Sequence, residues 1–461
     1  MAVTINDLAA IGSREAFGAV LAPQGRGYYV TLELLALVWG TMHHNDMVLP
    51  SLADAKTVTV ERRSHDFARR WMGGNKNDIS DDERELVTGK DSDEILRGLL
   101  TSLRVPIPNS RSLPTWPSQH LYPYVGELVH FDAVRARGSR WPRTGPRQKG
   151  ENPISIEQYT YRGAGGLAHK ILRTDLDHER LEANRAGLRA LVEDSGGPLG
   201  KLANACAAHD LAAPKTVKDE RESEAEVLPS RWVEVLRNGV ANVTARRKIS
   251  RSKRVDMLMH FVPFCVARHQ LDLACEILDE PPFVFPAALV TGPSRLRQHS
   301  RHEVDRARGI INRALPEVLR EYSSKLDPGE AEELVSSAER SRTWRNNIVS
   351  FFAGTMATAG ALNAHTGYRY VTLRLPLLEA LVCAMLPQGE EMEFDSFCTE
   401  VLMNQLHLVA DGRSARRIGL TARVDSGEFS ENETQLARDL LGLGMMREYS
   451  DATRMVHGEV R

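Results

Sequence analysis

A dense cluster of basic residues lies near the middle of the sequence. Six cations fall within nine positions with no acidic residue among them: Arg246, Arg247, Lys248, Arg251, Lys253 and Arg254. Proteins neutralise the phosphates of nucleic acids with arginine and lysine side chains, so the cluster is a candidate nucleic-acid contact. The alternative is that these residues only occupy the ends of two helices. An apolar run from Met257 to Ala267 follows the cluster and predicts a deeply buried helix.

The six cations divide into two groups by their place on the expected helices. A helix that starts near Ser230 is expected to end at residues 246–248, where positive charge stabilises the negative end of the helix dipole. The other three cations, Arg251, Lys253 and Arg254, are expected at the start of the next helix, for which Ser250 and Ser252 are two possible caps. We expect Pro263 to kink this helix or to divide it in two. Cations at the start of a helix are unfavourable without a compensating anion. These three residues, with no local counter-charge, therefore favour an anionic partner.

Histidine-rich segments suggest a second kind of chemistry, that of a metal ion. His43, His44 and Asp46 follow an expected helix, but adjacent histidines on a helix point about 100° apart and do not share one ion easily. His299 and His302 share a helical face, yet helical zinc sites use an i, i+4 pair with an intervening glutamate. A metal-dependent nuclease or phosphohydrolase built on either group is the enzyme alternative.

The rest of the sequence contains no catalytic motif of high specificity. We therefore predict no catalytic residue, no metal site and no cofactor, and a non-enzymatic role is the leading interpretation. Two further arginine-rich segments are expected on the surface. One is an expected helix with a second basic face, and the other is an insertion near residue 415: Arg295, Arg297, Arg301, Arg306, Arg308, Arg413, Arg416, Arg417 and Arg423.

The composition is that of a globular protein. The chain has 461 residues, of which 42% are hydrophobic and 26% charged. A formal net charge of -2 covers alternating acidic and basic blocks, so it argues neither for nor against a nucleic-acid partner. The 5 cysteines include no CxxC pair, which argues against a disulfide framework and favours the cytoplasm. No apolar stretch approaches the roughly 18 residues of a membrane span, so no membrane partner is expected.

The pattern of helical periodicity and proline predicts a mainly α, multi-domain chain with a C-terminal winged-helix-like α+β module. Residues 1–150 are expected to form an N-terminal mixed domain that ends in a proline-rich basic loop. Residues 151–347 are expected to form a helical middle domain, and residues 348–461 the winged-helix-like domain. Within this last domain, residues 368–373 alternate as a strand would.

The end of the sequence resembles a winged helix. Ser430 and Glu433 form a capping-box pattern, Gly442 is the expected helix end, and an alternating hairpin follows. Residues 431–442 would then be the recognition helix. The resemblance implies six contacts to DNA, four in a groove and two from the wing to phosphates: Asn432, Thr434, Gln435, Arg438, Arg447 and Arg454. Acidic residues on the same helix would repel phosphates, and many winged helices contact only proteins.

Two segments resemble accessory proteins of bacterial multi-gene anti-phage defence systems linked to DNA modification, of the phosphorothioation-dependent or methylation-associated kind. The segments are RRKISRSKRVDMLMHFVPFCVARHQLDLA and AHTGYRYVTLRLPLLEALV. In such systems the catalytic activities belong to separate chains. The resemblance implies a DNA-binding or scaffolding subunit of a defence complex, with duplex DNA and other protein subunits as partners. A winged-helix transcriptional regulator is the remaining alternative.

Overall fold

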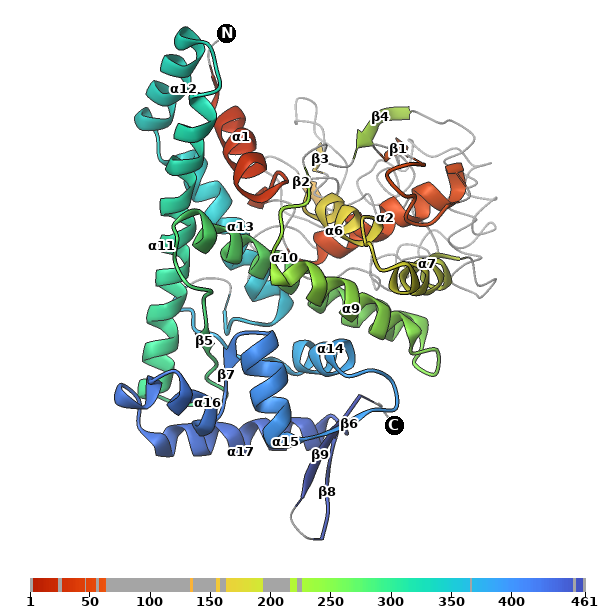
Figure 1. Ribbon diagram of the computed structural model, residues 1–461, viewed down its shortest axis with the longest axis vertical. Coiled ribbons are helices and arrows are strands. Elements are labelled where there is room, and N and C mark those ends of the chain that lie inside the picture. The colour runs from red at the N-terminus through yellow and green to blue at the C-terminus, as the bar shows by residue number, and fades with distance from the viewer. Residues whose placement is uncertain are drawn as a thin grey trace, which may run out of the picture.

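The computed structural model is mainly helical, which confirms the expected fold class at that level (Figure 1). The structure describes residues 3–23, 27–45, 47–54, 58–63, 133–135, 155–157, 163–193, 216–221, 226–364, 367–450 and 453–458. The helices are α1 (Ile5–Phe17), α2 (Tyr28–Asn45), α6 (Ala164–Arg173), α7 (His178–Val192), α9 (Arg231–Ala245), α10 (Arg251–Ile277), α11 (Arg295–Ser323), α12 (Pro328–Arg340), α13 (Thr343–Ala359), α14 (Leu375–Met385), α15 (Phe394–Ser396), the π-helix η4 (Phe397–Gln405), α16 (Gly412–Arg417), the 3-10 helix η5 (Leu420–Ala422) and α17 (Ser426–Gly442).

The strands are short and belong to small sheets. They are β1 (Thr59–Arg63), β2 (Ala133–Arg135), β3 (Ser155–Glu157), β4 (Thr216–Arg221), β5 (Phe285–Pro286), β6 (Glu391–Glu393), β7 (Leu408–Val409), β8 (Met446–Glu448) and β9 (Arg454–His457). The strand β1 pairs with β4 and β2 with β3, both antiparallel, whereas β5 pairs with β7 in parallel. In the C-terminal antiparallel sheet β9 lies between β6 and β8, with buried Val456 opposite both Met392 and Met446.

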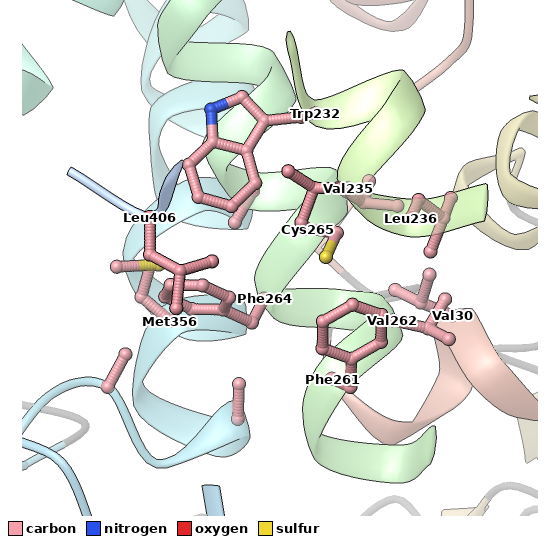
Figure 2. Close-up of a cluster of buried hydrophobic side chains, with 14 of the residues drawn as sticks. Val30, Trp232, Val235, Leu236, Phe261, Val262, Phe264, Cys265, Met356 and Leu406 are labelled. Atoms are coloured by element: carbon pink, nitrogen blue, oxygen red, sulfur yellow. The ribbon is translucent and has the colours of Figure 1, made fainter. Parts of the chain in front are cut away.

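The buried helix α10 lies at the centre of the described fold. Its main neighbours in space are α2, α9, α11, α13 and α14, and it also contacts α1 and α6. Ser250 caps the start of the helix, its side chain accepting a hydrogen bond from the N–H of Lys253, and the helix continues through Pro263. Residues 257–267 are buried on every face, as expected from an apolar run without a polar side (Figure 2). Burial continues through the polar residues Arg268, His269 and Gln270 to Leu271. Phe264 meets Trp232 of α9 edge to face, with ring centroids 5.6 Å apart.

The core is shared between parts of the chain that were expected to be separate domains. One hydrophobic cluster contains Leu8 of α1, Leu258 of α10 and Val456 of β9. The expected boundary between residues 347 and 348 falls inside α13, so it is wrong, because a helix continues through it. Residue 150, the other expected boundary, lies outside the described residues, as does the proline-rich basic loop apart from 133–135.

Two local expectations for the C-terminal part are also corrected. The helix α17 begins at Ser426, where the side chain of Asp425 accepts a hydrogen bond from Gly427, and not at the capping-box pattern of Ser430. The Ser430 hydroxyl instead donates to the Ser426 carbonyl inside the helix. The expected strand over 368–373 makes only an isolated bridge, between Leu362 and Val371. The hairpin of β8 and β9 matches its prediction.

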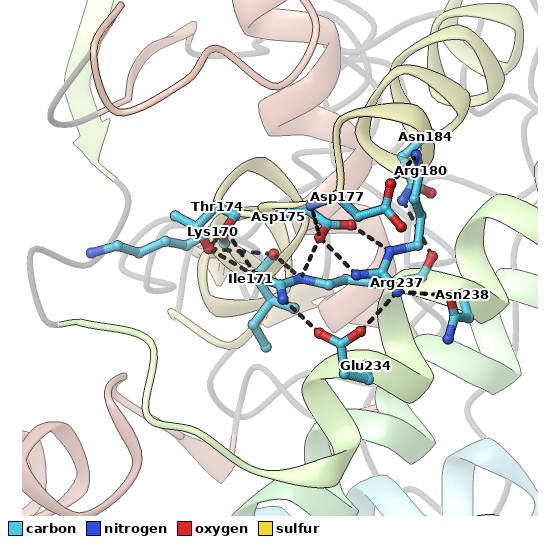
Figure 3. A network of polar contacts seen from close by, with 10 residues as sticks. All are labelled: Lys170, Ile171, Thr174, Asp175, Asp177, Arg180, Asn184, Glu234, Arg237 and Asn238. Carbon is cyan, nitrogen blue, oxygen red and sulfur yellow. Dashed lines mark hydrogen bonds and ion pairs between the residues drawn. The ribbon is translucent and has the colours of Figure 1, made fainter.

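A charged network joins α6, α7 and α9 on one side of the fold (Figure 3). The buried carboxylate of Asp175 accepts two hydrogen bonds from Arg180, at 2.6 and 2.7 Å, and lies 3.8 Å from Arg237. Glu234 binds the other sides of Arg180 and Arg237, each at 2.7 Å. Because Asp175 lies in the connection between α6 and α7, Arg180 on α7, and Glu234 and Arg237 on α9, the network fixes how these three helices pack.

We predict that Asp175→Asn destabilises the fold by about 3 kcal/mol, because it removes the buried one of the two carboxylates that neutralise the half-buried guanidinium groups of Arg180 and Arg237 and leaves only Glu234. Burial raises the pKa of Asp175, but the hydrogen bonds from Arg180 and Asp177 and the charge of Arg237 outweigh burial and hold it below the ordinary 3.8. A depressed folded-state pKa contributes stability at neutral pH that is lost as the pH falls through it.

The measurement is thermal unfolding between pH 7 and pH 3. The wild type should lose stability toward the acid end, and the difference from Asp175→Asn should shrink there. The matched control is Asp305→Asn, which removes an exposed ion pair with Arg308 and should change stability by less than about 1 kcal/mol. A pH-independent difference between wild type and Asp175→Asn would contradict the role given to the carboxylate.

A second prediction concerns the contact between α9 and α10. A Cβ atom on Gly239 would lie 2.1 Å from Cζ of the buried Phe261, so Gly239→Ala should destabilise the fold by about 1–3 kcal/mol. Gly309 of α11 has no heavy atom within 4 Å of its Cβ position, so Gly309→Ala should be neutral or stabilising by up to about 1 kcal/mol. Equal unfolding midpoints for both variants would show that the helices are not this close.

Candidate nucleic-acid interface

The central basic cluster is largely used inside the protein. The guanidinium of Arg246 is buried and donates to main-chain carbonyls at the end of α14 and beyond β9: Cys383 (2.9 and 3.2 Å), Leu386 and Gly458. These bonds tie the end of α9 to the C-terminal sheet. A side chain buried among main-chain carbonyls does not reach a phosphate, so the nucleic-acid role predicted for Arg246 is corrected to a structural one.

The cations at the start of α10 also have partners. Arg254 is buried and donates to the Thr244 carbonyl at 2.8 Å, and burial lowers the pKa of its guanidinium. Lys253 pairs with Glu379 of α14 and lies 3.5 Å from Asp256. The expectation of a missing counter-charge is therefore wrong for Lys253, to which the tertiary fold supplies Glu379, whereas Arg254 is bonded to a main-chain carbonyl and not to a carboxylate.

The three remaining cations of the cluster differ in exposure and do not form one continuous basic surface. Arg251 is half-buried and donates to the Glu193 carbonyl. Arg247 and Lys248 are exposed just after α9, and no carboxylate among the described residues pairs with either. Of the six cations of the central cluster, only Arg247 and Lys248 are exposed and accessible to an anion without displacement of a protein partner in the described structure.

Asn432 of the expected recognition helix is a buried structural residue. Its side-chain amide donates to the carbonyls of Ala287 (3.0 Å) and Ala410 (2.7 Å), and its oxygen accepts from the N–H of Leu289 at 2.6 Å. Three main-chain groups of the β5 and β7 region are thus satisfied by one side chain. The base contact predicted for Asn432 is corrected, because the side chain faces the core.

The exposed side of α17 and the hairpin carries balanced charge. Arg447 pairs with Glu391 at 3.2 Å. Arg454 lies 3.5 Å from both Asp395 and Glu433, and its guanidinium lies 4.3 Å from the ring centroid of Phe394. Both predicted wing contacts are therefore already paired with carboxylates or an aromatic ring. A phosphate would have to compete with these carboxylates.

The other predicted groove residues are divided between internal and external positions. Gln435 is half-buried and bonds to Asp439 at 2.8 Å. Thr434 is exposed and its hydroxyl donates to the Ser430 carbonyl, and Arg438 is exposed without a carboxylate partner among the described residues. Arg438 is thus the one predicted groove residue on this helix that combines exposure with an unpaired positive charge in the described structure.

A better-formed basic surface lies where the N-terminal half of α11 meets α16 and η5, at one corner of the fold (Figure 1). We call it the α11–α16 surface and define it by five exposed arginines: Arg295, Arg301, Arg413, Arg416 and Arg423. The two segments are held together by a small apolar cluster in which Leu296 of α11 packs with Leu420, Val424 and Phe429. Within the described ranges, no carboxylate lies within ion-pair distance of any of the five guanidinium groups.

The acidic residues around this surface already have partners. The Glu428 carboxylate accepts hydrogen bonds from the N–H groups of Arg295 (3.1 Å) and Leu296 (2.8 Å), so it caps the start of α11. Asp411 and Asp425 cap α16 and α17. Asp305 pairs with Arg308 at 3.3 Å and belongs to the neighbouring turn. The surface therefore has an excess of positive charge that the nearby acids do not balance.

The same corner contains one of the histidine pairs considered as a metal site. Burial lowers the pKa of His299 below its ordinary 6.5, Glu303 raises it, and the nearby Arg423 lowers it further. The Nε2 atom of His299 lies 3.7 Å from Glu303, and the described residues contain no group of three potential ligands suited to a metal ion. His43 and His44 lie in the last turn of α2, while Asp46 lies outside the described residues.

The sequence showed both arginine groups but not that they meet. Residues 295–301 and 413–423 are more than a hundred positions apart, and they are brought to one corner by the apolar contacts of Leu296 and by the hydrogen bonds from the start of α11 to Glu428. Comparison with protein families, curated proteins and solved structures finds no match for the chain. No helix among the described residues is long and apolar enough to cross a membrane.

The geometry predicts that Asn432→Ala acts on stability and not on DNA contact. Loss of three hydrogen bonds to buried main-chain groups should destabilise the fold by about 2–4 kcal/mol. The folded variant should bind duplex DNA with unchanged affinity. If Asn432 contacted a base, its replacement would instead lower the affinity and relax the sequence preference. Thermal unfolding and fluorescence anisotropy below the unfolding transition measure the two effects separately. Thr434→Ala, at an exposed position on the same helix, is the stability control.

Proposed function

We propose that this protein is a DNA-binding subunit that contacts the phosphate backbone through the α11–α16 surface. The observation that carries the proposal is the group of five exposed arginines without a carboxylate partner in the described structure. The planar guanidinium suits phosphate because it donates two parallel hydrogen bonds. Contacts of this kind position a protein on DNA without reading the sequence, so we propose binding of low sequence specificity.

We further propose that the C-terminal part is a winged-helix-like module that places this surface. The order α14, β6, η4, α17, β8, β9 and the sheet order β6-β9-β8 support this proposal. The paired state of Arg447 and Arg454 favours a module used mainly for protein contact over a transcriptional regulator that reads DNA with its wing. Arg247, Lys248 and Arg438 are proposed as additional, peripheral phosphate contacts.

The broader role that we propose is that of a DNA-binding or scaffolding subunit of a bacterial anti-phage defence complex, acting in the cytoplasm without catalytic activity of its own. The support for the complex is the sequence resemblance of residues 246–274 and 364–382. The four cysteines within the described residues are buried and unpaired, which is compatible with a reducing compartment. Other protein subunits and duplex DNA are the proposed partners.

The test uses the full chain and a duplex of random sequence. The triple variant Arg295→Ala, Arg416→Ala, Arg423→Ala should lower the duplex affinity more than about ten-fold, because three arginines no longer bind phosphates. It should also reduce the slope of log affinity against log salt by about 0.9 for each phosphate that the protein stops neutralising. Fluorescence anisotropy at several salt concentrations measures both quantities.

A matched control removes the same number of charges from the other end of α11 and the segment that follows it. Arg313, Arg320 and Lys325 pair with Glu280, Glu317 and Glu321, so replacing the three cations by alanine should leave the affinity within about two-fold. An equal decrease of affinity in the two triple variants would show a general effect of net charge. That result, or the absence of salt-dependent binding by the wild type, would overturn the proposed interface.

A further inference from the structure

An exposed tyrosine adjoins the α11–α16 surface. Tyr368 is 73% exposed, an unusual degree for an aromatic side chain, and the guanidinium carbon of Arg301 lies 3.7 Å from its ring centroid. No other described side chain has a ring contact with Tyr368. A cation above the ring stabilises one orientation of the tyrosine, and most of the ring stays open to solvent.

The main chain around Tyr368 is firmly held against α11. The side chain of Asn363 accepts from the N–H of Tyr370 at 2.8 Å and donates to the carbonyl of Tyr368 at 3.3 Å. The Ser300 hydroxyl of α11 accepts from the N–H of Val371 at 2.9 Å. The exposed ring is thus presented by an anchored segment, which reduces the entropy that a stacking partner would have to remove.

A second arginine on α11 repeats the arrangement one turn away. The guanidinium of Arg297 lies 4.6 Å from the ring centroid of Tyr370 and also donates to the Val290 carbonyl at 2.6 Å. Arg297 and Arg301 are four positions apart and share one flank of the helix. Because Tyr370 is half-buried and packs on the apolar cluster below, only Tyr368 of these two tyrosines offers an open ring.

The tyrosine and the arginine of the η5 region lie on opposite flanks of α11. Arg301 and His299 are two positions apart, so their side chains point about 200° apart around the helix axis. Arg301 is on the side of Tyr368, and His299 is on the side of Arg423. The solvent-exposed face of α11, about 10–12 Å wide with its side chains, therefore has Tyr368 along one edge and Arg423 along the other.

We infer that Tyr368 is a stacking platform for an unpaired base, so that the α11–α16 surface binds DNA in which a duplex adjoins a single-stranded segment. The inference rests on the proposed DNA-binding function and specifies its ligand. The arginines hold the phosphates of the duplex, and the unpaired base stacks on the open part of the Tyr368 ring. Stacking on an aromatic ring is available to every base, so the contact recognises the junction and not its sequence.

The experiment compares a blunt duplex with the same duplex carrying a single-stranded overhang, using the full chain and fluorescence anisotropy. The wild type should bind the overhang substrate about ten-fold more tightly than the blunt duplex. The variant Tyr368→Ala should lose this preference and keep the blunt-duplex affinity within about two-fold, whereas Tyr368→Phe should retain the preference. A 2-aminopurine at the first unpaired position should be quenched on binding by the wild type and not by Tyr368→Ala.

Tyr449 supplies a matched control, since it is 45% exposed at the end of β8 and far along the chain from α11. Tyr449→Ala should keep the overhang preference. Equal affinities of wild type and Tyr368→Ala for the overhang substrate would overturn the stacking inference and leave duplex binding by the arginines intact. A wild type that binds neither substrate would instead remove the proposed function itself, so the two failures are distinguishable.

Discussion

Burial of residues 257–271 of α10 on every face constrains the whole described fold, because each helix around this segment must present an apolar side to it. The segment 257–271 leaves no polar face for solvent, and α2, α9, α11, α13 and α14 surround it. Packing this dense also fixes distances between helices. Gly239 of α9 is needed where Phe261 approaches, and Trp232 meets Phe264 edge to face. Charged groups at the ends of these helices are then brought toward one another whatever their separation in sequence.

This packing explains why a basic sequence segment need not be a basic surface. Moving a guanidinium out of water is unfavourable unless hydrogen bonds replace those of water. Arg246 is compensated by carbonyls of residues 383, 386 and 458, and Lys253 by Glu379. All of these partners are far away along the chain. By contrast, the arginines of the α11–α16 surface lie in a region where Glu428, Asp411 and Asp425 are committed to helix caps. Positive charge therefore remains unpaired there.

The sequence predicted the features that depend on local interactions. The helical fold class, a cap at Ser250 or Ser252, the buried apolar run of α10 and the terminal hairpin all follow from periodicity and capping, and the structure selects Ser250 as the cap. The α17 start was misplaced because Asp425 and Ser430 both fit a cap, and only the fold decides between them. The domain boundary at 347 was misplaced because α13 packs against the same core as the earlier helices. The site depended on Leu296 meeting residues 420–429, a long-range contact without a local signal.

The carboxylate of Glu428 at the start of α11 determines how any phosphate could be held at this corner. The first N–H groups of a helix are a ready-made anion site, but here the N–H groups of Arg295 and Leu296 already bond to Glu428. A phosphate bound here would therefore accept hydrogen bonds from long, rotatable arginine side chains and not from rigidly held main-chain N–H groups. Such a contact tolerates shifts of the backbone by several ångströms, so a protein held this way could move along DNA without first releasing it.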